Sequence, residues 1–133
     1  MTARGIRNAN PLNIRKSGDV FEGEVVPSTD NSFKRFETAA YGYRAAFKIL
    51  RTYVTKYGLN TIRKMITRWA PPEDGNHTEN YIKAVSERSG IPADDIIYPD
   101  NREMMIRIVA AMSFVENGEP AKMEDVIAGW ELL

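Results

Sequence analysis

The chain has 133 residues, of which 43% are hydrophobic and 27% are charged, as is ordinary for a single globular domain. Its 18 basic and 18 acidic side chains cancel, which excludes a strong overall field for recruiting nucleic acid or an anionic membrane. There is no cysteine and no long apolar run, so we expect no disulfide, membrane span or signal peptide.

The first quarter of the chain is expected to form a polar arm and a small sheet. Residues 1–11 are polar and predicted to be irregular. Residues 20–26 have β-type composition, and residues 33–36 alternate apolar and basic side chains. We therefore expect a small antiparallel hairpin or three-stranded sheet within residues 13–36.

Five helices are expected after the sheet, because apolar side chains recur there every three or four residues. The expected ranges are about 38–57, 61–70, 78–90, 100–117 and 123–133, with Asn60, Asn76 and Asp100 as caps of the middle three. The predicted class is α+β and mostly helical. A single domain would span residues 1–133, with the arm and sheet in 1–36 and the helical part in 37–133.

The sequence lacks the residues that several common kinds of functional site require. His77 is the only histidine and lies in a polar loop, where an exposed side chain is the simplest interpretation. A zinc site would therefore need carboxylates alone. With His77 as the sole imidazole base, no serine stands in a recognisable nucleophile elbow, so a serine–histidine triad is not expected either. No phosphate-binding glycine loop is present. We expect no metal and no cofactor.

The helix expected to end near residue 117 carries one carboxylate inside its apolar stripe. At about 100° of rotation per residue, Glu116 falls on the core side of that helix. It shares this side with Met105, Ile108, Val109 and Met112. Desolvation and the helix dipole both favour the neutral acid, so we predict a raised pKa for Glu116. Acid catalysis on a glycosidic oxygen requires such a proton donor.

An exposed head on a long stem is the alternative for Glu116, since a helix-end glutamate can reach water. A glycosidase with two carboxylates would need a second acid, and Asp19, Glu22 and Glu24 are candidates. Glu22 and Glu24 share one strand face, where a solvated surface is the simpler interpretation. Gly118 permits a left-handed turn that returns the chain over the site.

The segment RGIRNANPLNIR at residues 4–15 resembles the RGIRNNNPGNIR opening of a family of small phage and prophage proteins. These are described as virion or structural proteins, and the resemblance implies lysozyme-like activity. It continues over most of the chain, through YGYRA at 41–45 and WAPP at 69–72, to ENG at 116–118.

Two positions depart from that pattern. Ala9 stands where the pattern has asparagine, and Leu12 stands where it has glycine. We expect the second change to matter more, because a Cβ at Leu12 would alter the turn after Pro11 and block close approach of a ligand.

The segment AAMSFVENG at residues 110–118 resembles the helix end of lysozymes and lytic transglycosylases, in which a glutamate followed by a small polar residue is the catalytic acid. In bacterial glucosaminidases that helix precedes the sheet, whereas here NPLNIR at 10–15 comes first. The resemblance implies a circularly permuted lysozyme-like arrangement, with the sheet against the Glu116 helix. Such an analogy does not by itself fix function.

Together these resemblances predict a phage-associated glycosidase or lytic transglycosylase that cleaves peptidoglycan between N-acetylmuramic acid and N-acetylglucosamine. Glu116 is the predicted general acid, and in a transglycosylase the sugar's own 6-hydroxyl replaces a second carboxylate. The predicted substrate-binding residues are Asn10, Asn13, Arg15, Thr78 and Tyr81.

Two other functions stay open at this point. A virion structural or peptidoglycan-binding module would keep the lysozyme-like shape without turnover and contact glycan strands or other virion proteins. Nucleic-acid binding through the basic arm, Arg4 to Lys16, fits poorly with zero net charge. We expect no nucleic-acid or membrane partner, and a place in the virion, or in the host cytoplasm during infection, with action on the cell wall.

Overall fold

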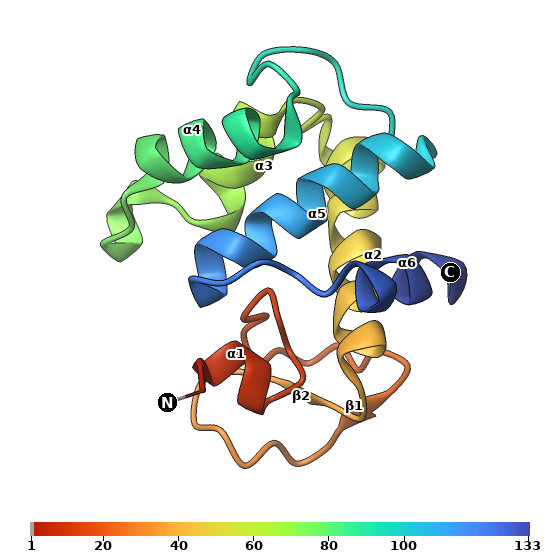
Figure 1. Ribbon diagram of the computed structural model, residues 1–133. Helices are drawn as coiled ribbons and strands as arrows, with labels where there is room; N and C mark the ends of the chain where they lie inside the picture. The colour runs from red at the N-terminus through yellow and green to blue at the C-terminus, as the bar shows by residue number, and fades with distance from the viewer. Residues whose placement is uncertain (1) are drawn as a thin grey trace.

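Helices and a short two-stranded sheet make up the computed structural model, which describes residues 2–133 (Figure 1). The expectation for Met1 lies outside the described residues. The elements in chain order are α1 (Arg4–Arg7), β1 (Glu24–Val25), β2 (Arg35–Phe36), α2 (Ala39–Tyr57), α3 (Ile62–Trp69), the 3-10 turn η1 (Pro72–Asp74), α4 (Thr78–Ser89), α5 (Arg102–Asn117) and α6 (Met123–Glu131). The predicted α+β class, mostly helical with a small antiparallel sheet, is confirmed.

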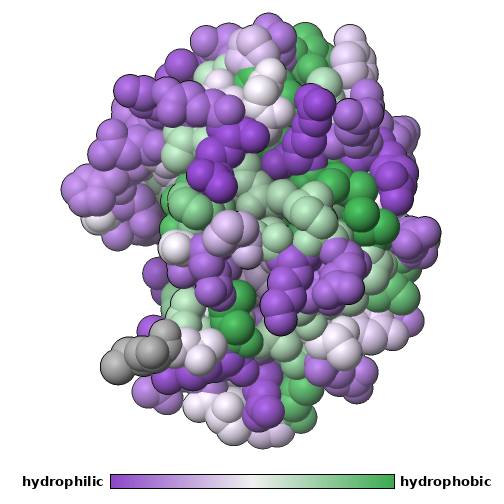
Figure 2. All heavy atoms as spheres, in the orientation of Figure 1, coloured by the Kyte–Doolittle hydropathy of each residue, from purple (hydrophilic) through white to green (hydrophobic). Residues whose placement is uncertain are grey.

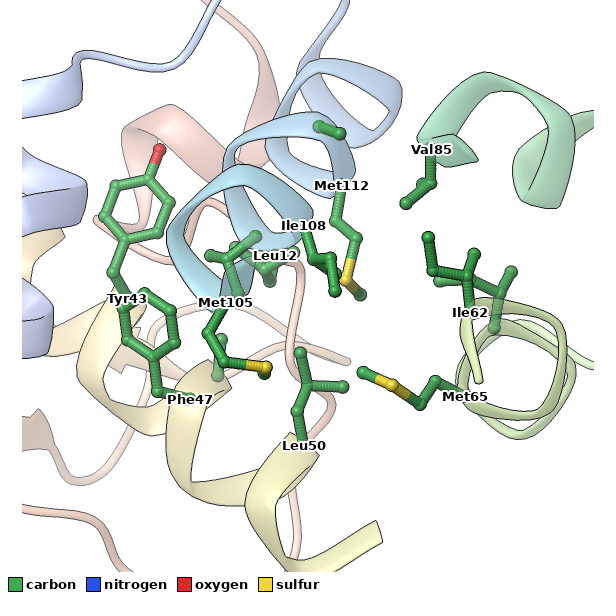
Figure 3. Close-up of a cluster of buried hydrophobic side chains, with 14 of the residues drawn as sticks. Leu12, Tyr43, Phe47, Leu50, Ile62, Met65, Val85, Met105, Ile108 and Met112 are labelled. Atoms are coloured by element: carbon green, nitrogen blue, oxygen red, sulfur yellow. The ribbon is translucent and has the colours of Figure 1, made fainter. Parts of the chain in front are cut away.

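The helical part is organised around α5, which contacts α1, α2, α4 and α6 and crosses the middle of the molecule (Figure 1). The predicted apolar stripes supply its core. Figure 3 shows side chains of α2, α3, α4 and α5 gathered in one interior, among them Phe47, Leu50, Met105, Ile108 and Met112, all buried. Each such side chain contributes about 1.5–3 kcal/mol when fully buried. This packing fixes the axis of α5 and hence the place of its last turn.

The apolar stripe of α2 is not buried at its C-terminal end. Tyr57, the last residue of the helix, is 46% exposed. Its ring is instead covered by the Arg68 guanidinium, 4.3 Å from the ring centroid, a cation–π contact at the surface. Earlier in the stripe, Phe47 packs edge-on against Trp130 of α6 at 5.2 Å, which joins the last helix to the core.

The caps of three helices lie one residue later than predicted. They are Thr61, His77 and Asn101 rather than Asn60, Asn76 and Asp100. Thr61 and Asn101 each accept a bond from the backbone N–H three residues on, which satisfies an otherwise unpaired donor. The Asn76 amide donates instead to the Pro71 carbonyl at 3.0 Å and so braces the loop before α4.

The N-terminal segment, residues 2–36, differs from the expectation in two ways. One helical turn, α1, stands where irregular chain was expected. The strands are shorter than predicted, with only Glu24 paired to Phe36 and Val25 to Arg35, plus one antiparallel bridge between Arg15 and Phe33. Side-chain bonds, more than a strand ladder, hold this segment together.

Two buried polar residues make several of those bonds. Asn10 is fully buried, and its amide donates to the carbonyls of Ile14 (3.0 Å) and Lys34 (2.9 Å) and accepts from the Ile14 N–H (2.9 Å). Lys34 is 1% exposed, and its ammonium donates to both Glu24 oxygens (3.0 Å each) and to the Asp19 carbonyl (2.7 Å). A buried charge is tolerated when it is paired and hydrogen-bonded in this way.

On the face in Figure 2, hydrophilic side chains cover most of the surface and hydrophobic ones gather across the middle, at the level of α5 and α6 in Figure 1. Among the described helices, none combines the length and the apolar character that crossing a bilayer requires.

Candidate functional site

Glu116 lies in the last turn of α5, one residue before the helix ends at Asn117. Gly118 closes the helix in the left-handed conformation predicted for it, with φ 71°, and its N–H donates to the Phe114 carbonyl at 2.8 Å. The Glu116 side chain is partly buried, and it faces both α4 and the N-terminal segment.

Two donors hold the Glu116 carboxyl group. Asn13 Nδ2 donates to Oε1 at 2.8 Å, and the Tyr81 hydroxyl donates to Oε2 at 2.8 Å. The donors lie 103 and 35 residues away in the sequence, so the fold alone brings them together. Because each donor engages a different oxygen, the pair fixes both the plane and the rotamer of the carboxyl group.

The surroundings of Glu116 change its protonation. Burial raises the pKa of Glu116, while the bonds from Asn13 and Tyr81, the Trp69 side chain and the Arg15 charge lower it. The net pKa is raised, which confirms the direction predicted from the sequence. Burial, together with the Glu116 carboxylate, also raises the pKa of Tyr81 well above its ordinary value, so its hydroxyl remains a donor.

Asn13 suits its position for two reasons. Its backbone is left-handed, with φ 52°, a conformation that asparagine tolerates better than most residues. Its amide also supplies the donor to Glu116. The side-chain amide oxygen Oδ1 of Asn13 is buried without a hydrogen-bond partner among the described residues, as is Oδ1 of Asn117.

Gly5 of α1 allows this arrangement. A Cβ at Gly5 would lie 2.6 Å from Asn117 Oδ1, 2.8 Å from the Asn10 carbonyl and 2.9 Å from Asn13 Oδ1. Real Cβ atoms do not approach oxygens so closely, so only glycine fits. The Asn117 amide in turn donates to the Pro11 carbonyl at 2.7 Å, which ties the N-terminal segment to α5. The glycine of the RGIRN segment is therefore a close-packing requirement of the site.

Two adjoining cavities flank Glu116. One, of about 330 Å³, is lined by Asn13, Ile14, Arg15, Phe33, Ile49, Tyr53, Trp69, Ala70, Asp74, Asn76 and Glu116. The other, of about 420 Å³, is lined by Asn76, His77, Asn80, Tyr81, Val115 and Glu116. Since Glu116 and Asn76 line both, we call the two cavities together the Glu116 groove. Its walls come from the N-terminal segment and from α3 to α4, which lie on opposite sides of the end of α5 in Figure 1.

Of the five residues predicted to bind substrate, three lie at the groove and two do not. Asn13, Arg15 and Tyr81 line it. The prediction for Asn10 is wrong, because its buried amide is fully used by the turn that it braces. The prediction for Thr78 is also wrong, because its buried hydroxyl donates to the Ala70 carbonyl at 2.5 Å and links the end of α3 to the start of α4.

The expectation for Leu12 is corrected as well. Its side chain is fully buried in the core beside α5 and does not face the groove (Figure 3). The left-handed positions of this segment are Ala9, with φ 51°, and Asn13. The asparagine of the related pattern at position 9 therefore fits the backbone better than the alanine present here.

The carboxylates considered as partners of Glu116 lie elsewhere. Glu24 is bound to buried Lys34, and Glu22 pairs with Arg44 at 3.2 Å. Asp19 does not line the groove and offers its carbonyl to Lys34. The sequence analysis missed Asp74 of η1, an exposed acid that lines the same cavity as Glu116. The one feature of the sequence that could have indicated Asp74 is its position as an acidic residue shortly after Pro71, where the helix expected at 61–70 ends.

A larger cavity, of about 1150 Å³, lies between α1 and the chain from Gly118 to Asp125 and does not include Glu116. Tyr43 and Ser113 form its inner wall, with their hydroxyls bonded to each other at 2.8 Å. Its charged lining is of both signs, and none of its acids has the carboxyl geometry seen at Glu116. The chemistry therefore points to the smaller groove.

Metal ligands do not gather anywhere in residues 2–133: no group of three or more histidine, aspartate or glutamate side chains lies close enough to hold an ion. His77 is exposed at the start of α4, as its loop composition indicated.

Comparison with known proteins gives one informative similarity, and no family model matches the chain. The chain is 43% identical over 133 residues to Protein P5 of Pseudoalteromonas phage PM2, an alignment that covers 97% of this chain and 81% of that protein. The similarity therefore includes both the N-terminal segment and the helix that carries Glu116.

Proposed function

From the premise that this chain belongs to the family of Protein P5 of phage PM2, we propose that it is a phage-associated enzyme that cleaves the glycan strands of peptidoglycan. The bond cleaved would join N-acetylmuramic acid to N-acetylglucosamine. Membership in a phage protein family supports the phage-associated role. The Glu116 groove supports the chemistry.

One observation carries this proposal: a partly buried carboxyl group with a raised pKa is held by two donors where two cavities meet. A glycosidic oxygen at that junction would have a sugar on either side, one in each cavity. Desolvation favours the protonated form of Glu116 before reaction. Once the proton has left, the bonds from Asn13 and Tyr81 stabilise the carboxylate that remains.

In the proposed reaction, Glu116 donates its proton to the leaving oxygen as the bond to the anomeric carbon breaks. The positive charge that develops on the sugar ring is captured either by the 6-hydroxyl of the same sugar or by water. In the first route the ionised Glu116 takes the proton of the 6-hydroxyl as the new bond to the anomeric carbon forms; this gives a transglycosylase and needs no second carboxylate. The second needs a base for water, and Asp74 is the groove residue of the right kind.

The test is loss of turbidity of purified cell walls, followed by analysis of the released fragments. The wild type is expected to clear the walls and Glu116→Gln to lose at least about a hundredfold in rate, the scale of general acid catalysis. Glu87→Gln is the matched control, because Glu87 is exposed on α4, outside the groove. Equal rates for the wild type and Glu116→Gln would remove Glu116 from the reaction.

A non-catalytic virion structural or peptidoglycan-binding module is the second candidate, and one observation favours it. Both Glu116 oxygens are already bonded, so the side chain also acts as a tie between α5, α4 and the N-terminal segment. In that case wild type would sediment with insoluble cell wall without releasing fragments, and Glu116→Gln would change stability alone.

A further inference from the structure

Arg15 is a basic side chain that lines the Glu116 groove, and it forms no ion pair with a carboxylate of the described residues. It is exposed, lines the same cavity as Glu116, and takes part in none of the ion pairs of residues 2–133. Asp74 lines that cavity too, but lies outside ion-pair distance of Arg15. A guanidinium in a groove without a partner is suited to an anionic ligand.

The Arg15 guanidinium packs against an aromatic ring. It lies 5.3 Å from the centroid of the Phe33 ring, which also carries Arg4 at 4.6 Å. Arg4 is anchored by two bonds of 2.6 Å to Asp30. The backbones of Arg15 and Phe33 form the isolated antiparallel bridge, so the two residues that make this contact are also paired through their main chains. Little side-chain freedom remains to be lost when Arg15 binds a ligand.

We propose that Arg15 binds a carboxylate of the substrate next to the bond on which Glu116 acts. This proposal rests on the proposed function and specifies that the groove prefers a negatively charged substrate. In peptidoglycan such a carboxylate has two sources: the lactyl group of muramic acid when it bears no peptide, and the acidic groups of the peptide stem when it does. A planar guanidinium recognises either in a bidentate manner.

The charge balance around Glu116 agrees with an anionic ligand at this point. Arg15 is the cation whose field favours the ionised form of Glu116. A carboxylate bound to Arg15 would offset that field and help Glu116 keep its proton until the bond breaks. The neutral neighbours Asn13, Trp69 and Tyr81 would be unaffected by such a ligand.

The experiment compares three forms of one preparation of glycan strands. The first keeps its peptide stems, the second is stripped of stems by an amidase so that the lactyl carboxylates are free, and the third is the stripped material with those carboxylates coupled to methylamine. The proteins are the wild type, Arg15→Gln, Arg15→Lys and Lys16→Gln. Lys16 is the matched control, because it is exposed and next in the chain but does not line the groove.

For the wild type and Lys16→Gln we expect kcat/KM on the preferred charged strands to exceed that on the amidated strands by about ten- to hundredfold, the scale of a charge-assisted bond. Arg15→Gln should reduce that ratio to about one, and Arg15→Lys should restore part of it. Preference for stem-bearing over stripped strands assigns the carboxylate to the peptide, and the reverse assigns it to the lactyl group. If Arg15→Gln lowered kcat/KM equally on all three substrates, the proposal for Arg15 would be overturned, while the proposed cleavage of glycan strands would stand.

If the wild type cleaves none of the strands, the proposed function fails and binding decides the inference. The same three ligands are then titrated by calorimetry into the wild type and Arg15→Gln. Tighter binding of charged strands that disappears in Arg15→Gln would support the Arg15 site without turnover. Binding that does not depend on charge or on Arg15 would overturn it.

Discussion

Replacing Gly5 by alanine tests how the N-terminal segment supports Glu116. The new Cβ would lie 2.6–2.9 Å from three oxygens, and one of them, the Asn10 carbonyl, belongs to backbone braced by a fully buried side chain. The other two, on Asn13 and Asn117, belong to side chains whose amides are already bonded, to Glu116 and to the chain at Pro11. The clash can therefore be relieved only by moving the residues that hold Glu116 and the N-terminal segment in place.

The magnitude follows from two opposing effects. Alanine in place of glycine within a helix gains up to about 1 kcal/mol of helix propensity. Overpacking of a tight site costs about 1–3 kcal/mol, and more where backbone cannot yield. We expect a net loss of about 2 kcal/mol. With an unfolding entropy of about 0.28 kcal/mol/K for a chain of 133 residues, this lowers Tm by about 7 °C.

The assay is thermal unfolding of wild type, Gly5→Ala and Gly18→Ala, because no atom lies within 4 Å of a Cβ built at Gly18. Gly18→Ala should keep Tm within about 2 °C of the wild type, since exposed substitutions change stability by about 0.5 kcal/mol or less. In Gly5→Ala the displaced Asn13 loses its bond to Glu116, a bond that lowers the pKa of that acid. The basic limb of the pH–activity profile should therefore move to higher pH. Unchanged Tm and profile in Gly5→Ala would refute this reasoning.

Three further predictions concern single side chains. Because burial raises the pKa of Glu116 above its ordinary 4.5, the ionised folded protein carries a penalty that is absent at low pH, so stability is lost as pH rises through the folded pKa. Urea unfolding should show Glu116→Gln gaining stability over the wild type between about pH 4 and about pH 7; a constant difference would contradict the shift. Ala9→Gly should raise stability by about 0.5–1 kcal/mol, because a left-handed alanine costs about 1–2 kcal/mol and glycine loses part of that gain as entropy. A lower urea midpoint would mean that packing of the Ala9 methyl group outweighs the strain. Asp74→Asn should reduce hydrolysed ends among the released fragments about a hundredfold if Asp74 activates water, as measured by mass spectrometry of the products. An unchanged product ratio would assign capture to the sugar's 6-hydroxyl.

Local patterns in the sequence were enough to predict the helices and the special character of Glu116. A period near 3.6 identifies the buried faces of α2 and α5 and places Glu116 on the second of them. Whether its carboxyl group is desolvated or reaches water on its long stem depends on what lies opposite. What lies opposite depends on contacts between distant segments. Tyr81 was identified as a residue placed to line a groove, but that its hydroxyl meets Glu116 follows only from the packing of α4 against α5.

The errors have a common physical origin. Asn10 and Thr78 are polar residues near turns, and the sequence does not distinguish a side chain that faces a ligand from one that satisfies buried backbone. Lys34 lies between Phe33 and Arg35 in a segment whose composition does not mark it as buried, yet its side chain is 1% exposed and paired with Glu24. Asp74 was overlooked because only the meeting of η1 with the N-terminal segment places it beside Glu116.

The long sequence separation between Asn13 and Glu116 has a consequence for when the molecule becomes competent. Asn13 leaves the ribosome about a hundred residues before its acceptor, and α5 must already be docked on α2 and α4 before the two can meet. A nascent or partly degraded chain thus holds neither the oriented acid nor the groove around it. Under the proposed function, cleavage of the cell wall would require the completed tertiary structure, so the protein would be inert during its own synthesis.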